Sequence, residues 1–359
     1  VWLPLAHPAA PVPASAVLSG AMIKVALLGW LRFLPVGAEA LAGWGLLLVF
    51  TGLLTLFFAI PIGLVQSNPK VILAYSSVSK MGLLALVFGL LLVDPGLAPA
   101  GILAITLYAA HHALVKGALF LGVGLRLHGP LQGLVLAGLA LLALSLVGFP
   151  PTSGAVAKSG IKPTLAGADW SWLTQAVVYS AAATTLLMAR FRWVVWRLPT
   201  HPERGYGAGL AAWGALTALS AAYALVLGSR DAWLANPWPV VVGLALAGAV
   251  ALVAWLRPAL LGSLIGRVAP GDLLALVGPL VEVGRFSIQT GARQVRRARR
   301  FLISRTGEAL TALRSRSGDP ETQMSGWPTA GAAWLGILGL LLVLAFALPV
   351  VEGPPEAMA

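Results

Sequence analysis

The sequence lacks cysteine altogether and has few charged residues. Among its 359 residues there is no Cys, and only 10% are Asp, Glu, Lys or Arg. The lack of Cys excludes disulfide bonds, thiolate catalysis, zinc–thiolate sites and iron–sulfur clusters held by thiolates. A soluble globular domain carries about 25% charged residues, whereas 58% of this chain is hydrophobic. The composition therefore predicts a protein with several membrane spans.

The hydrophobic residues gather in long runs. Stretches of about 20 apolar residues can cross a bilayer, and nine such stretches are expected here. They cover residues 14–35, 42–65, 71–93, 100–127, 132–157, 172–197, 207–228, 237–256 and 328–350. Proline and glycine interrupt the fifth, in GFPPTSG at 148–154, and precede the first, in HPAAPVP at 7–13. Such breaks survive in lipid only where protein or water satisfies the freed backbone groups, so we expect two discontinuous helices.

Acidic residues are scarce as well. The chain has 24 Lys and Arg against 12 Asp and Glu, a formal net charge of +12. If the N-terminus is cytoplasmic, the loops rich in Arg and Lys fall on the cytoplasmic side, in agreement with the positive-inside rule. We therefore expect a multi-pass protein of the inner (cytoplasmic) membrane with its C-terminus outside.

One segment differs in kind from the spans. Residues 285–316 carry nine Arg and one acidic residue, Glu308, with apolar residues interspersed. This pattern favours a helix that lies on the cytoplasmic membrane surface with its arginines facing anionic headgroups. Nucleic-acid binding is the weaker interpretation, because the segment has few aromatic residues on which bases could stack.

Ionisable residues inside membrane spans indicate function, because each costs about 3 kcal/mol on insertion scales. Those in or beside the expected spans are Lys24, Lys80, His111, His112, Lys116 and Lys158. Tyr108, His112 and Lys116 are spaced i, i+4, i+8, so they share one helix face at intervals of about 6 Å. Histidine and buried lysine can both exchange protons. This spacing is typical of a proton relay.

Less specific interpretations remain for three of these lysines. Lys24 and Lys80 could reach from a helix end towards the headgroups, and Lys158 could be an ordinary loop lysine. No Asp or Glu lies in the middle of an expected span. The buried lysines are therefore often neutral, or their carboxylate partners lie on another segment or subunit.

Four segments, in their order, resemble the proton-conducting antiporter-like membrane subunits. This family includes membrane-arm subunits of respiratory complex I, subunits of membrane-bound hydrogenases of the hydrogenase-4 and formate hydrogenlyase types, and subunits of Mrp sodium/proton antiporters. The segments are WLPLAHPAAPVPASAVLSGAMIKVALLGWLRF (2–33), NPKVILAYSSVSKMG (68–82), YAAHHALVKGALFLGVG (108–124) and LVGFPPTSGAVAKSGIK (146–162). The resemblance is strong over about residues 1–200.

The resemblance implies an all-α, polytopic transmembrane helical bundle with an inverted-repeat antiporter-like core and a C-terminal lateral amphipathic helix. It divides the chain into the end of a first inverted repeat (1–40), a second repeat that forms the proton-conducting core (41–200), two further transmembrane helices (201–258), the lateral basic helix (259–326) and a last span with its tail (327–359). Almost all of the family's first repeat would lie upstream of Val1, so an N-terminally truncated or split chain is expected.

The resemblance also implies roles for individual residues. Lys24, His112, Lys116 and Lys158 match family positions of the central proton relay. Tyr108 stands where many members have a further His, beside His111. Lys80 stands where Gln is usual, and the family gives it no role.

The expected function is that of a proton-translocating subunit of a redox-driven complex, of the NADH–quinone oxidoreductase or hydrogenase-4 type. Redox chemistry would occur in other subunits, since the chain shows no flavin, quinone or cluster motif, and neither cofactor nor metal is expected. Two alternatives are a subunit of an Mrp-type cation/proton antiporter and a non-conducting structural half-subunit. Expected partners are other membrane subunits, a missing N-terminal half or a neighbouring antiporter-like subunit, lipid, and protons or Na⁺, but not nucleic acid.

Overall fold

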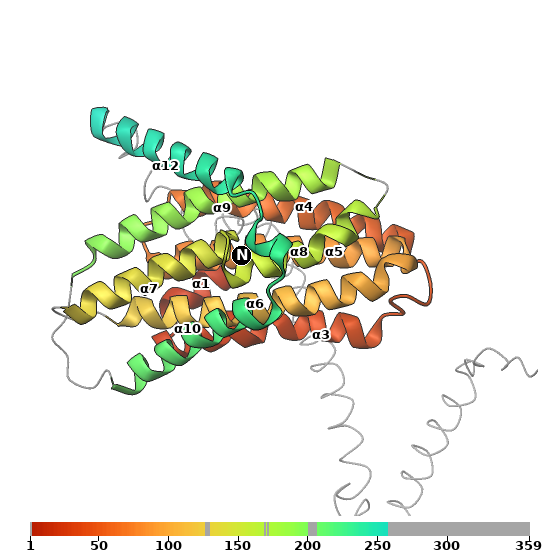
Figure 1. Cartoon of the computed structure of the whole chain (residues 1–359), viewed down its shortest axis with the longest axis horizontal. Helices are drawn as coiled ribbons and strands as arrows, with labels where there is room; N and C mark the ends of the chain where they lie inside the picture. Colours follow the sequence, from red (N-terminus) through yellow and green to blue (C-terminus); the bar gives the residue numbers. More distant parts are fainter. Residues whose placement is uncertain (1, 126–129, 169, 171, 200–206, 258–359) are drawn as a thin grey trace, which may run out of the picture. The chain divides into compact units, whose positions relative to one another are not determined.

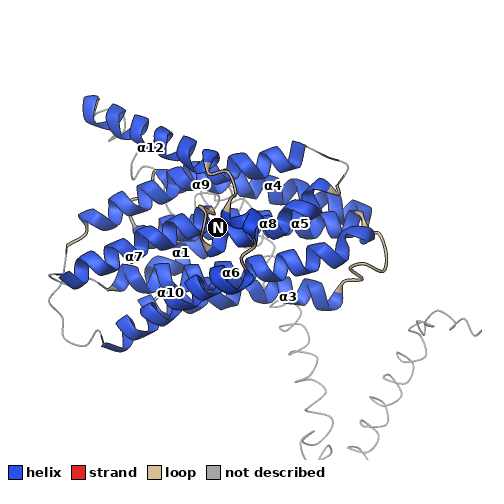
Figure 2. Cartoon of the chain, in the orientation of Figure 1, coloured by secondary structure: helices blue, strands red, loops and turns tan. Residues whose placement is uncertain are grey.

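The computed structural model describes residues 2–125, 130–168, 170, 172–199 and 207–257, which belong to the first of two units, Val1–Leu276. The described residues form helices and no strand (Figure 2). Seven helices in this part of the chain are long and apolar enough to cross a membrane. The prediction of an all-α bundle of membrane helices is confirmed.

The helices follow the expected spans closely (Figure 1). In chain order they are α1 (Trp2–Ala9), α2 (Val12–Val17), the π turn η1 (Leu18–Met22), α3 (Ile23–Phe33), α4 (Ala42–Leu64), α5 (Pro69–Val93), the 3₁₀ turn η2 (Pro95–Leu97), α6 (Ala98–Gly124), α7 (Pro130–Val147), α8 (Ser153–Ala166), α9 (Trp172–Arg197), α10 (Gly207–Leu227), α11 (Arg230–Trp233) and α12 (Trp238–Leu256). The span expected at 328–350 and the basic segment 259–326 lie outside the described residues.

Both expected interruptions are present. In HPAAPVP, α1 ends at Ala9 and α2 begins at Val12. In GFPPTSG, α7 ends at Val147 and α8 begins at Ser153. Proline lacks a backbone N–H and disfavours helical geometry in the residue before it, which explains why helices stop at these two motifs. The fifth span is therefore two helices, α7 and α8, rather than one helix over 132–157.

Helix α5 is the most deeply buried of the spans. It begins cleanly because Pro69 occupies its first turn and the Asn68 side chain accepts a hydrogen bond from the Lys70 N–H at 2.9 Å, a favourable N-terminal cap. Helices α1, α4, α6 and α9 all contact it. Any polar side chain in the middle of α5 is therefore enclosed by protein.

Glycines allow α4 and α5 to pack backbone against backbone. A Cβ atom on Gly52 would lie 2.6 Å from the Gly82 carbonyl oxygen, and one on Gly82 would lie 2.7 Å from the Gly52 carbonyl oxygen. Gly45 and Gly89 repeat the same reciprocal contact seven residues away on each helix. Small residues at such positions drive helix association in lipid, where van der Waals packing replaces the hydrophobic effect.

Replacement of Gly52 by valine should lower the free energy of unfolding by about 1–3 kcal/mol, the usual range for an overpacked site. The matched control is Gly43→Val on the same helix, because a Cβ atom there would meet nothing within 4 Å. Chemical denaturation in detergent, followed by circular dichroism, measures both variants. Equal stability of the two variants would contradict close packing between α4 and α5.

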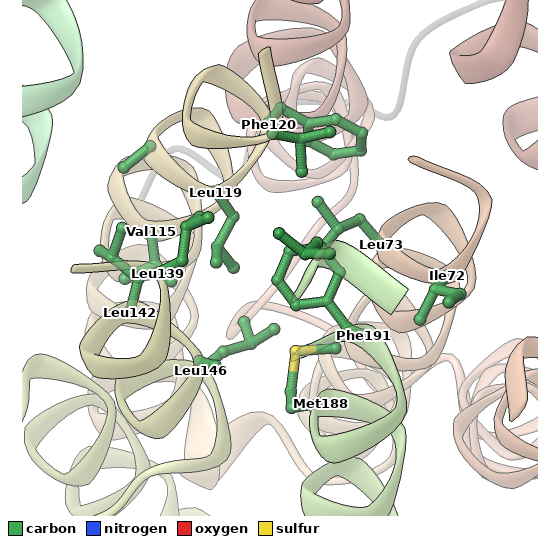
Figure 3. Packing of buried hydrophobic residues seen from close by; sticks show 14 of the residues in the cluster. Ile72, Leu73, Val115, Leu119, Phe120, Leu139, Leu142, Leu146, Met188 and Phe191 are labelled. Carbon is green, nitrogen blue, oxygen red and sulfur yellow. The ribbon is translucent and has the colours of Figure 1, made fainter. Parts of the chain in front are cut away.

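Aliphatic and aromatic side chains fill the space between α5, α6, α7 and α9 (Figure 3). The labelled members are Ile72, Leu73, Val115, Leu119, Phe120, Leu139, Leu142, Leu146, Met188 and Phe191. This cluster fixes the position of α6 against α5. Helix α6 carries four of the expected relay residues, Tyr108, His111, His112 and Lys116.

Candidate functional site

The expected relay residues are gathered on neighbouring helices. Lys80 on α5 and His111, His112 and Lys116 on α6 have no exposed surface. Lys24 on α3 and Lys158 on α8 are half-buried. Helices α5, α6 and α8 contact one another, so the structure brings these side chains into one region of the bundle.

Two oxygen atoms of α5 bind the Lys116 ammonium. Its Nζ donates to the Leu73 carbonyl at 2.7 Å and to the Ser76 hydroxyl. The same carbonyl accepts hydrogen bonds from Ser76 Oγ at 2.8 Å and from Ser77 Oγ at 3.2 Å. Lys116 is thus held by neutral oxygen atoms, which can stabilise the cation without neutralising it.

A continuation of this network leads to Lys24. Ser77 Oγ lies 2.8 Å from Ser19 Oγ in the π turn, and Lys24 Nζ donates to the Ser19 carbonyl. Ser77 donates to the same Leu73 carbonyl as Lys116. The two serines and two backbone carbonyls therefore form a polar link between the lysines of α3 and α6.

Lys80 has a partner that lies far away in the sequence. Its Nζ donates to Thr184 Oγ1 on α9 at 2.7 Å, and that hydroxyl donates to the Ser180 carbonyl at 2.6 Å. With no exposed surface and a partner on α9, Lys80 does not reach towards headgroups. The snorkelling interpretation of Lys80 is wrong.

The three residues of the expected relay face lie buried on α6. Tyr108 is 1% exposed, and His112 and Lys116 are fully buried. The Tyr108 hydroxyl and both ring nitrogens of His112 have no hydrogen-bond partner among the residues that the structure describes. Buried polar groups nearly always make hydrogen bonds. Groups on one helix face that lack a protein partner are therefore suited to binding water or a proton.

Lys158 lies at the break between α7 and α8. Its Nζ donates to the carbonyl of Val147, the last residue of α7, which has no partner within its own helix. A Cβ atom on Gly148 would lie 2.6 Å from Lys158 Cδ, and Gly148 has a φ of 80°. Glycine is therefore required at position 148 for two reasons: the backbone has a positive φ, and the Lys158 side chain occupies the space that a Cβ atom would need. Lys158 is a helix residue, not a loop lysine.

Three of the lysines lie on helices that contact one another. Lys80, Lys116 and Lys158 belong to α5, α6 and α8. Like charges repel strongly in a low-dielectric interior, so a proton that arrives on one lysine affects the next. Lys80, which has no role in the family resemblance, is thus buried in the same bundle as Lys116 and Lys158.

Sequence reasoning missed several polar residues of the site. The His7 ring is fully buried and stacked on Phe120 with 4.2 Å between ring centroids, and neither ring nitrogen has a partner in the described part of the chain. Its motif, HPAAPVP, indicated only a break. The hydroxyls of Ser19 and Thr184 carried no signal, because serine and threonine are common in membrane helices. Within the described ranges, no group of three or more His, Asp or Glu residues could hold a metal ion.

Comparisons with known proteins find a matching family model and several relatives. A family model described as NADH:quinone oxidoreductase/Mrp antiporter, transmembrane, matches residues 1–184. Hydrogenase-4 component B of Escherichia coli (strain K12) is 38% identical over 134 residues, 34% of this chain and 20% of that protein. Formate hydrogenlyase subunit 3 of the same strain is 34% identical over 128 residues, 34% of this chain and 21% of that protein.

Antiporter subunits match as well. Na(+)/H(+) antiporter subunit A1 of Staphylococcus aureus (strain JH9) is 33% identical over 185 residues, 46% of this chain and 23% of that protein. A chain of the Mrp complex from Dietzia sp. DQ12-45-1b shares the fold, with a TM-score of 0.60 and 23% identity over 99% of this chain and 40% of that chain. The matches to these three curated relatives span about a fifth of each relative's length.

Proposed function

The chain belongs to the NADH:quinone oxidoreductase/Mrp antiporter transmembrane family, and from this we propose that it moves protons across a membrane as one subunit of a redox-driven complex. The proposed complex is of the membrane-bound hydrogenase or NADH–quinone oxidoreductase type. Redox chemistry takes place in other subunits, and this chain supplies the route for the proton.

The observation that carries the proposal is the series of buried lysines and histidines on α3, α5, α6 and α8. An unpaired ammonium ion is expensive to bury, so a protein keeps several of them only for a purpose. Each group can bind a proton and release it to a neighbour. Neutral hydroxyls and carbonyls hold the lysines in place, which leaves these side chains free to change charge.

The proposed proton route runs along these lysines. One hydrogen-bonded network holds Lys24 and Lys116, through Ser19, Ser77 and the Leu73 carbonyl. Its two carbonyl oxygens only accept hydrogen bonds, so the network positions the lysines and does not itself carry the proton. Lys80 lies on α5, which contacts the helices of both Lys116 and Lys158. Lys158, at the broken helix, is the group that exchanges protons with one side of the membrane. His112 and Tyr108 extend the Lys116 face of α6.

The names of the relatives support a redox-driven complex. Hydrogenase-4 component B and formate hydrogenlyase subunit 3 are named as parts of hydrogenase and formate hydrogenlyase systems. The Na(+)/H(+) antiporter relatives and the fold shared with an Mrp complex favour the alternative, cation/proton exchange. A structural half-subunit that conducts nothing is the third candidate, and the buried lysines argue against it.

The proposal extends to the surroundings of the chain. Its partners are other membrane subunits and lipid, and its membrane is the inner membrane, with the C-terminus outside. Residues 41–200 act as the second inverted repeat and proton-conducting core.

Reconstitution of the intact complex in proteoliposomes distinguishes these functions. We expect the complex's electron donor and acceptor to drive a change in internal pH, recorded by a pH-sensitive dye, and we expect the rate to be unchanged when K⁺ replaces Na⁺. A pH change driven by a Na⁺ gradient without any redox reaction would instead establish cation/proton exchange. Redox turnover without any proton movement would instead support the structural half-subunit that conducts nothing.

A further inference from the structure

One serine at the broken helix joins three other helices. Ser153, the first residue of α8, is 1% exposed. Its Oγ lies 2.9 Å from His111 Nδ1 on α6, 2.8 Å from Ser145 Oγ on α7 and 2.9 Å from Ser220 Oγ on α10. Ser145 and Ser220 are themselves 4% and 5% exposed. We call these four residues the Ser153 cluster.

With three partners, the Ser153 hydroxyl makes as many hydrogen bonds as a hydroxyl can. A hydroxyl donates one hydrogen bond and accepts two. If His111 Nδ1 carries a proton, it donates to Ser153, which then accepts from one serine and donates to the other. If Nδ1 is bare, Ser153 donates to it and accepts from both serines. The position of the His111 proton is therefore coupled to the direction of the hydrogen bonds that Ser145 and Ser220 make.

Helix α10 also touches α6 at the turn that carries His111. The Tyr223 hydroxyl donates to the Leu107 carbonyl at 3.0 Å, and Leu107 lies one helical turn before His111. The ring centroids of Tyr223 and His111 are 6.3 Å apart. Ser220 and Tyr223 are three residues apart, so they share one face of α10, and that face is directed at His111 and Ser153.

Helix α10 begins at Gly207, beyond residues 1–184 that the family model matches. We propose that Ser220 is a positioning residue for proton transfer through His111: it acts through Ser153 and sets the direction in which that hydroxyl points. Ser220 itself passes no proton onward. This role rests on the proposed function, in which the buried histidines of α6, His111 among them, bind and release protons.

Ser220→Ala in the complete complex tests the proposal. We expect proton transfer in proteoliposomes to slow about three- to tenfold, the effect of one hydrogen bond, and Ser220→Thr, which keeps the hydroxyl, to restore the rate. The matched control is Thr217→Ala on the same helix, since the Thr217 hydroxyl donates only to the Trp213 carbonyl of its own helix. That variant should retain the original rate.

A double-mutant cycle separates positioning from packing. If Ser220 acts through Ser153, the Ser220→Ala change adds nothing in a Ser153→Ala background, whereas independent packing defects multiply. An unchanged rate in Ser220→Ala, or independent effects in the cycle, would overturn the inference. If Lys116→Met stops proton transfer while Ser220→Ala does not slow it, only the positioning role of Ser220 is wrong. If Lys116→Met has no effect on proton transfer, both the proposed function and the positioning role are wrong.

Discussion

Replacement of Lys116 by methionine should slow proton transfer by the intact complex about 100-fold or more, as expected when a positioned proton-exchanging group is removed. Lys116 is fully buried, and its ammonium donates hydrogen bonds across to the Ser76 hydroxyl and the Leu73 carbonyl of α5. Methionine keeps the length of the side chain but cannot bind a proton. The fold should survive, because Ser76 Oγ and the Leu73 carbonyl remain bonded to each other at 2.8 Å.

Proteoliposome acidification measures the rate of the Lys116 variant, and redox turnover is recorded in the same preparation. Leu119→Met is the matched control, since it places the same new side chain in the packed core of α6. We expect the control to pump normally. Equal rates for Lys116→Met and Leu119→Met would remove Lys116 from the proton route.

Replacement of Lys158 by methionine should have an effect of similar size, about 100-fold. Lys158 is the cation at the break, and its ammonium covers the carbonyl at the end of α7. Lys162 lies four residues later on the same helix and is exposed, so Lys162→Met removes the same charge without touching the break. We expect that control to retain the original rate.

The same acidification assay compares the two α8 variants. A slow Lys158→Met variant with a normal redox rate would show that electron flow has lost its coupling to protons. If Lys158→Met and Lys162→Met pump equally well, the break serves the architecture alone, and proton release must be sought elsewhere in the complex.

The helical framework was predictable from the sequence because two local signals determine it. Apolar runs set the spans, so the run expected at 71–93 is the helix Pro69–Val93. Proline and glycine set the breaks, and both motifs interrupt helices where expected. The π turn at Leu18–Met22 was not predicted, because a widened turn depends on the contacts of its surroundings and leaves no comparable local signal.

The site was predictable only in part, for a similar reason. The face of Tyr108, His112 and Lys116 followed from helical spacing, since all three residues belong to one helix. The partners Lys80 and Thr184 are 104 residues apart, and Ser153 and Ser220 are 67 residues apart. Such pairs arise from the packing of different helices, which spacing along one helix cannot reveal.

The π turn places a constraint on chain length. In a regular α-helix, residues five apart point about 140° away from each other, so Ser19 and Lys24 would face different neighbours. The wider turn, with its i→i+5 bonding pattern, brings the Lys24 ammonium back to the Ser19 carbonyl while the Ser19 hydroxyl meets Ser77. Deleting one residue here would rotate Lys24 by about 100° and leave the hydrophobicity of the span almost unchanged. In the π turn, the number of residues therefore matters to function independently of which residues they are.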